Sequence, residues 1–244
     1  MPAWLERQWP WLVWIIFAAI IGIGVAAANR YIPKQHLPWA KLDPTLPLGF
    51  GTKSQLLRLS LEPSETCMTL ARDITDFETI PSEPKGPKGL DGSGVCGWKV
   101  ARLVYGSDDT VLAPGEANMQ CPLSVGTYLW MRELDVLAVE RFGVGLAKIH
   151  HMGTYSCRRQ RGNGSGKWSE HAFGNAWDVA AFELEDKTLI SVKSDWADKG
   201  DEGAYLREAR RAACKIFKVT LSPDYNAAHH DHFHLDMGPS SSCR

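Results

Sequence analysis

The chain has 244 residues, of which 44% are hydrophobic, and its formal net charge is −1. A charge this close to zero argues against a broad basic surface, so we expect no nucleic-acid partner. The length suffices for one sizeable domain together with an appendage.

An uncharged apolar segment, WPWLVWIIFAAIIGIGVAAA, occupies residues 9–28. As a helix it would be about 30 Å long, which matches the hydrocarbon core of a bilayer. It is longer than the apolar region of about 7–15 residues in a cleavable signal peptide, and it begins with tryptophans typical of membrane interfaces. We therefore expect a cytoplasmic N-terminus over 1–8 and a transmembrane anchor over 9–28. A signal peptide cleaved near the alanines at 26–28 is the alternative.

Two features disagree about the side of the membrane on which the rest of the chain lies. Arg30, Lys34 and Lys41 follow the span, and this positive charge slightly favours the cytoplasm. The cysteines contain no CxxC pair, which argues against a thiolate zinc cluster. Six cysteines behind a membrane-targeting segment indicate three disulfides in an oxidising compartment, with buried free thiols as the alternative. We give more weight to these cysteines, which are Cys67, Cys96, Cys121, Cys157, Cys214 and Cys243.

The remaining segments predict one domain over 51–244 behind a proline-bearing linker over 29–50. Helical patterns at 53–60 and 64–74 precede a loop at 81–94 and a strand-like run at 98–106. The clearest helix begins near Pro122 and ends near Gly143. The later expected elements are strands at 146–152, 176–184 and 188–192, a loop at 161–168 and a helix at 203–218. Helices come first and short strands surround the polar motifs, so we predict an α+β fold with a small antiparallel sheet flanked by helices.

Four of the eight histidines lie in one short stretch, HHDHFHLD, at 229–236. Phe233 and Leu235 alternate with His232 and His234, which is typical of a half-buried strand. The two imidazoles would then project from one face while the apolar pair packs behind them. A solvated or metal-binding histidine run is the alternative for this stretch alone.

A second polar motif, SEHAFGNAWDVA at 169–180, contains His171 and Asp178. Gly174 and the small Ala176 lie between them, so the backbone can bend there and another group can approach closely. Asp178 sits in an otherwise apolar strand, where an unpaired carboxylate is costly. A metal ion is one partner that would stabilise it. The alternative is that Asp178 pairs with an arginine and that His171 caps a turn.

These residues resemble a known family. SEHAFGNAWD resembles the S-x-H-x6-D signature of the zinc peptidases related to lysostaphin and the D-alanyl-D-alanine metallopeptidases, and HFH resembles their H-x-H. More closely, the stretch from about Pro38 to Cys243 resembles the bacterial extensin-like C-terminal domain family. VCGW at 95–98, MQCPLS at 119–124 and GTYSCRRQRG at 153–162 support this resemblance.

The resemblance implies one zinc ion per chain, bound by His171, Asp178 and His234. Two nitrogens and one oxygen leave a fourth position for water, as in catalytic zinc sites. Zinc lowers the pKa of that water towards about 7, and the water would attack the substrate carbonyl. His232 is then the expected general base or oxyanion donor. Some related enzymes have a glutamate there, and the histidine resembles the endopeptidase-like branches more than a carboxypeptidase.

Other residues near the motifs have expected roles with open alternatives. Arg158 is expected to clamp a substrate carboxylate or the oxyanion, with a surface arginine as the alternative. Glu170 and Asp231 are expected to orient the imidazole N–H groups. Asp236 is expected to take such a role or to stabilise a turn. His229 and His230 are interpreted as loop residues.

The expected function is a zinc hydrolase, either carboxypeptidase or endopeptidase in type, that cleaves peptide bonds of peptidoglycan. Its expected place is a bacterial inner membrane, crossed once, with the C-terminal domain in the periplasm. The alternatives are a non-catalytic cell-wall-binding module and a structural envelope protein with a vestigial metal site. Another divalent ion can also replace zinc, since affinity alone does not select it.

Overall fold

The computed structural model describes residues 3–62, 64–72, 78–80, 96–97, 101–104, 106–107, 110–115, 117–160 and 165–244. The loop expected at 81–94 lies outside the described residues. So do parts of the strand-like run at 98–106 and of the loop at 161–168.

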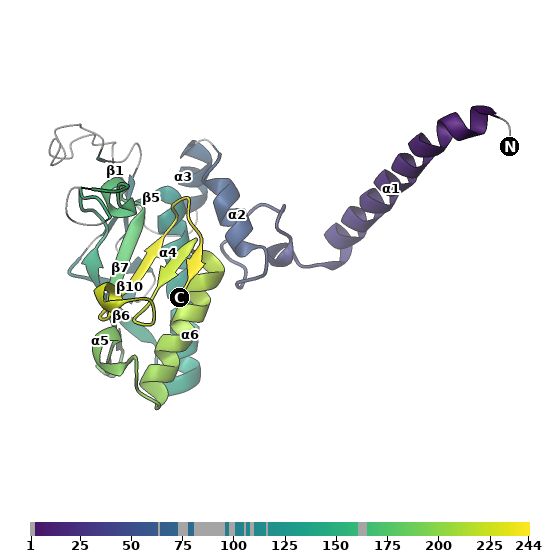
Figure 1. The fold of residues 1–244 in the computed structure, drawn as a ribbon. Helices are drawn as coiled ribbons and strands as arrows, with labels where there is room; N and C mark the ends of the chain where they lie inside the picture. Colours follow the sequence, from purple (N-terminus) through teal and green to yellow (C-terminus); the bar gives the residue numbers. More distant parts are fainter. Residues whose placement is uncertain are drawn as a thin grey trace.

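The N-terminal helix α1 (Ala3–Tyr31) extends away from the rest of the chain (Figure 1). Its segment Trp11–Tyr31 is long and apolar enough to cross a membrane, and none of the tested window is buried. Such a helix is compatible with a single-pass membrane protein or with a signal sequence. The helix runs three residues into the expected linker, which also contains the 3-10 helix η1 (Lys34–His36).

The helices of the domain agree closely with the sequence patterns. The clearest predicted helix is α4 (Cys121–Phe142), with proline in its first turn. It ends at Gly143, whose φ of 76° is the left-handed conformation that glycine adopts readily. The other helices are α2 (Thr52–Leu59), α3 (Ser64–Arg72), the short α5 (Val192–Asp195) and α6 (Asp201–Ile216).

The predicted small antiparallel sheet is wrong in size and in direction. An eight-stranded sheet has the order β11-β9-β10-β7-β6-β4-β3, with β8 paired to β7, and it is mixed because β4 is parallel to β6 and β11 to β9. A second sheet has the order β1-β2-β5. The strands of the large sheet are β3 (Gly106–Ser107), β4 (Thr110–Ala113), β6 (Leu146–Gly153), β7 (Ala176–Leu184), β8 (Leu189–Ser191), β9 (Val219–Leu221), β10 (Phe233–Asp236) and β11 (Ser242–Cys243). The small sheet contains β1 (Glu78–Ile80), β2 (Ala101–Val104) and β5 (Ala117–Gln120).

Helices α4 and α6 pack against one face of the large sheet through an aromatic core. Trp130 of α4 lies at its centre and is fully buried. Its ring meets four other buried rings edge to face, at centroid distances from 5.8 to 6.3 Å: Trp177, Phe182, Phe217 and Phe233. Edge-to-face contacts of this kind stabilise a core beyond the area that they bury. The polar side chains of the central strands are left for the other face of the sheet.

Three disulfides join the elements, as the cysteine pattern predicts. Cys67–Cys121 links α3 to the start of α4, Cys96–Cys157 lies beside the loop before η2, and Cys214–Cys243 links α6 to β11. All six cysteines are therefore paired, and the alternative of buried free thiols is wrong.

Candidate metal centre

A short 3-10 helix, η2 (Glu170–Phe173), positions His171. The hydroxyl of Ser169 accepts the backbone N–H of His171 at 3.3 Å and so caps the first turn. Gly174 ends the turn with a φ of 62°, and β7 begins two residues later. The bend predicted at this glycine is thereby confirmed, and it brings His171 back over the strand that carries Asp178.

The antiparallel pairing of β10 with β7 brings the two halves of the site together. His234 is directly opposite Asp178, and Phe233 is opposite Val179. Residues opposite each other in an antiparallel pair point to the same face, so the carboxylate and imidazole meet while their neighbours enter the core. The strand expected at 229–236 begins only at Phe233, and His232 lies in the turn before it.

Three donor atoms converge on one point. Nε2 of His171 is 3.1 Å from Oδ2 of Asp178, and Nδ1 of His234 is 2.9 Å from Oδ1. The two imidazole nitrogens are 3.2 Å apart. All three side chains therefore offer a ligand atom within 4.8 Å of the others, which makes them a candidate metal-binding group.

The remaining ring nitrogens are held in the way that metal-binding imidazoles are usually held. Nδ1 of His171 donates to the backbone carbonyl of Thr154 at 3.1 Å, and a carbonyl can only accept. Nε2 of His234 is 3.0 Å from Oδ2 of Asp236, whose other oxygen accepts the N–H of Gly238 at 2.8 Å. In the neutral rings, both remaining lone pairs face Asp178. This donor set fits a divalent zinc ion, for which two nitrogens and one carboxylate oxygen are common ligands.

His232 stands beside the three candidate ligands. Its Nδ1 donates to Oδ1 of Asp231 at 2.8 Å, and its Nε2 is 3.7 Å from Oδ1 of Asp178. The side chains of His232, Asp178 and His234 are each 13% exposed, so the cluster is largely buried but still reaches the surface. Asp231 thus orients His232 and not a candidate ligand.

The cluster carries opposing charges in a poorly solvated place. Burial would raise the pKa of Asp178, but the two imidazoles of His171 and His234 outweigh burial and hold that pKa well below its usual range. Burial would lower the pKa of His234, but its contacts with Asp178 and Asp236 raise the pKa to about 9. Asp178 and Asp236 thus favour positive charge between them, and a bound cation would supply it.

Glu170 and Arg158 lie at the edge of this arrangement. The carboxylate of Glu170 accepts from the side-chain amide of Asn175 at 2.6 Å, and burial raises its pKa. The position expected for Glu170, beside a ligand imidazole, is taken by Asp236. The backbone carbonyl of Arg158 accepts the N–H of Ser169 at 3.1 Å. The side chain of Arg158 is exposed, and its charge is one cause of the lowered pKa of His229.

From the sequence alone, His229 is interpreted as a loop residue outside the site. The structure instead places its ring beside the cluster. Its ring lies 5.3 Å from that of His232 and 5.8 Å from that of His234. Asn226 begins the 3-10 helix η3 (Ala227–His229) and accepts from Nδ1 of His229 at 2.8 Å. Burial, followed by the two neighbouring histidines, lowers the pKa of His229 to about 4. Asn226, three positions earlier, is a strong helix-capping residue, but a cap predicts only the short helix and not that it brings His229 to the cluster.

Four other histidines lie outside the cluster. His36 accepts the backbone N–H of Phe50 at 3.2 Å. His230 is exposed and pairs with Asp231 at 3.7 Å. His150 contacts Glu183 at 3.2 Å, and His151 contacts the carbonyl of Gly115 at 3.2 Å.

Comparison with known proteins identifies one family. The family described as Extensin-like protein C-terminus matches residues 67–244, which include every residue of the candidate metal centre. No curated protein and no solved structure shows significant similarity to the chain.

Proposed function

The chain belongs to the extensin-like protein C-terminus family, and we propose that it is a membrane-anchored zinc-dependent hydrolase that cleaves peptide bonds of peptidoglycan in the periplasm. The observation that carries the proposal is the convergence of His171, Asp178 and His234. The S-x-H-x6-D and H-x-H motifs around these residues resemble those of the lysostaphin and D-alanyl-D-alanine metallopeptidases, and this resemblance supports the proposal.

The proposal assigns one role to each group around the site. His171, Asp178 and His234 hold one zinc ion, which when bound supplies a Lewis acid that activates water and polarises a carbonyl. Thr154 and Asp236 fix the ring orientations of the two ligand histidines. An orientation fixed before binding lowers the entropy lost when the ion is coordinated.

His232 is the proposed proton-transfer residue. Asp231 accepts the Nδ1–H of His232, so the lone pair of the neutral ring is on Nε2. This Nε2 lies 3.7 Å from Oδ1 of Asp178 and faces the site. In this position Nε2 can take a proton from the attacking water and later return it to the leaving amine. The exposed Arg158, whose charge acts on His229, is the proposed partner for a carboxylate of the peptide.

The proposed location follows from the anchor and the disulfides. Helix α1 has the length and composition of a membrane span, and three disulfides are typical of an oxidising compartment. We therefore propose that α1 crosses the inner membrane and that the domain lies in the periplasm. There the disulfides would form and the candidate metal centre would face the peptidoglycan.

The metal content of the full-length protein, purified in detergent, tests the site. We expect one zinc ion per chain, which Asp178→Asn abolishes together with hydrolysis of purified peptidoglycan. Asp186→Asn is the matched control, because Asp186 lies in an exposed turn where asparagine can still accept the N–H of Thr188. Absence of bound metal from the unmodified protein would sink the hydrolase proposal. Hydrolysis by a zinc-free Asp178→Asn protein would show that the mechanism is wrong.

A further inference from the structure

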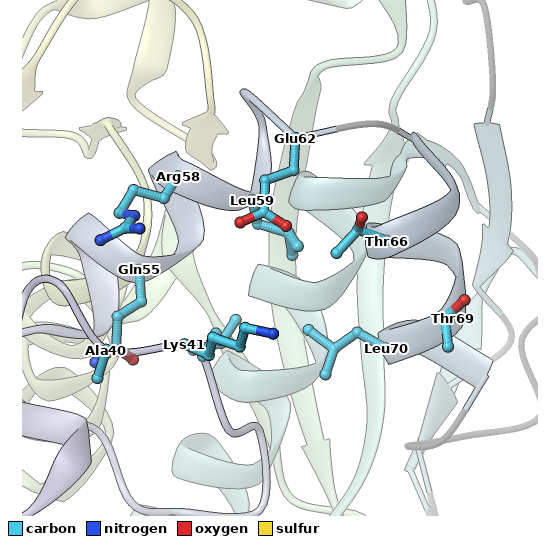
Figure 2. Close-up of a pocket in the computed structure, with 10 residues that line it drawn as sticks. Ala40, Lys41, Gln55, Arg58, Leu59, Glu62, Thr66, Thr69 and Leu70 are labelled. Carbon is cyan, nitrogen blue, oxygen red and sulfur yellow. The ribbon is translucent and has the colours of Figure 1, made fainter.

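Two adjacent pockets lie where the chain leaves α1 and enters the domain. The first, of about 370 Å³, lies between residues 40–42 and helices α2 and α3 (Figure 2). The second, of about 630 Å³, reaches from the same residues back to Asn29 in the last turn of α1. The pockets are neighbours because they share four lining residues: Ala40, Lys41, Leu42 and Leu70. Their sizes are those of small-molecule sites.

The first pocket combines apolar walls with charged groups. Leu42, Leu59 and Leu70 line it, and Figure 2 shows the side chain of Lys41 running toward Leu70 while Leu59 and Glu62 face it from α2 and the turn that follows. Leucine walls favour a hydrocarbon chain. The ammonium group of Lys41, in the same lining, favours a ligand that also carries negative charge.

Positive charge is concentrated around the pockets. Residues 30–62 contain five basic residues against two acidic ones, whereas the whole chain has a net charge of −1. Lys34 and Lys41 line the second pocket, and Arg58 lines the first. The acidic group of the second pocket, Asp43, already accepts the hydroxyl and N–H of Thr45, at 2.6 and 3.1 Å. The lysines of the second pocket form no ion pair with a carboxylate in the described part of the chain.

Two exposed aromatic residues lie between α1 and the pockets and indicate how close the pockets are to the membrane surface. Tyr31, the last residue of α1, is 82% exposed, and Trp39 is 43% exposed. Nε1 of Trp39 donates to the side chain of Asn29 at 2.9 Å, which ties the pocket wall to the end of the apolar helix. Tyrosine and tryptophan favour the headgroup layer of a bilayer. The pockets therefore border the layer where lipid phosphates lie.

We propose that the two pockets hold one anionic phospholipid of the bilayer that α1 crosses. Its phosphate lies beside Lys34 and Lys41, and one acyl chain lies against Leu42, Leu59 and Leu70. The proposal rests on the membrane anchor of the proposed function and not on the zinc site. It also gives a reason for the basic residues after the span, which otherwise count against an exported domain.

The test measures lipid binding to the full-length protein in a non-ionic detergent by native mass spectrometry. Phosphatidylglycerol and phosphatidylcholine with the same acyl chains are titrated separately. We expect the anionic lipid to bind more tightly. The double variant Lys34→Gln/Lys41→Gln should weaken its binding by about fivefold for each charge removed and leave the zwitterionic lipid unchanged. Leu70→Gln should weaken both lipids, because it places a polar group against the acyl chain.

The control removes the same charge elsewhere, as Lys193→Gln/Lys199→Gln, at two exposed positions outside both pockets. Equal binding of the two lipids by the unmodified protein, or an equal loss in the control, would overturn the proposal. Soluble glycerol phosphate that binds as tightly as the lipid would also overturn it, since the acyl chain would then contribute nothing. Circular dichroism of each variant verifies folding. Alkaline carbonate extraction of membranes tests the anchor separately, so failure of the anchor is distinguishable from failure of the lipid site.

Discussion

His234 and Asp236 lie two residues apart on β10, and Nε2 of the imidazole is 3.0 Å from Oδ2 of the carboxylate. Two residues apart on a strand means the same face, so Asp236 can hold the ring while its Nδ1 faces Asp178. The same carboxylate accepts the N–H of Gly238 at 2.8 Å, which fixes its own position. Asp236 is thus a positioning residue for a candidate zinc ligand.

We expect Asp236→Asn to weaken zinc binding by roughly 10- to 100-fold, the usual effect of losing a partner of a ligand histidine. The measurement is zinc affinity by competition with a chromophoric chelator. Glu170→Gln is the matched control, because Glu170 is a neighbouring, partly buried carboxylate whose hydrogen bond goes to Asn175. An equal loss of affinity in both variants would contradict the orienting role of Asp236.

His232→Ala should keep the zinc ion and slow hydrolysis of peptidoglycan by about 10²- to 10⁴-fold, the usual contribution of a general base. Asp231→Asn should have a smaller effect in the same direction, because it removes the charged acceptor of the Nδ1–H. Zinc content and the release of soluble fragments are measured on the same preparations. If the unmodified protein binds zinc but cleaves no detectable peptidoglycan, the result would favour a non-catalytic module in which zinc organises a wall-binding surface.

The Cys96–Cys157 disulfide should support zinc binding as well as stability. The residues next to these cysteines hold η2 by backbone hydrogen bonds: Gly97 N–H to Ala172 O at 2.9 Å and Ser156 N–H to His171 O at 3.1 Å. Replacing both cysteines by serine should therefore loosen His171 and weaken zinc binding. Removing either this disulfide or Cys214–Cys243 should lower the free energy of unfolding by about 4 kcal/mol, from the loop lengths.

The Cys214→Ser/Cys243→Ser variant is the control, since that disulfide joins α6 to β11 and lies outside η2. Zinc affinity and denaturant unfolding are measured for both variants. An unchanged zinc affinity in the Cys96→Ser/Cys157→Ser protein would show that this disulfide acts on stability alone.

The long, regular patterns were sufficient to predict the elements that form the site. The apolar alternation around Asp178 predicts β7 with its observed bounds, and Pro122 and Gly143 delimit α4. The alternation of His234 with Phe233 and Leu235 predicts that the two apolar side chains enter the core, and both are fully buried. His232, expected on the same strand, precedes it.

The remaining parts depend on tertiary contacts that no local pattern records. Strands such as β9 (Val219–Leu221) contain three residues, too few to show a period of two. Glu170 directly precedes His171, but its carboxylate contacts Asn175, so the acid that contacts a candidate ligand is Asp236. His229 enters the cluster because η3 turns the chain back over the site.

The pH dependence of stability offers a test at His151, away from the candidate ligands. Burial lowers the pKa of His151, while the carbonyl of Gly115, 3.2 Å from Nε2, offsets this only in part. The unfolded chain therefore binds a proton that the folded chain resists, so His151 lowers the free energy of unfolding as the pH falls below about 6.5. His151→Gln keeps a donor for Gly115 and removes the titration. We expect urea unfolding at pH 7.5 and 5.5 to show a smaller loss of stability in His151→Gln than in the unmodified protein. The same loss in both proteins would mean that His151 accepts its proton as readily in the folded chain as in the unfolded one.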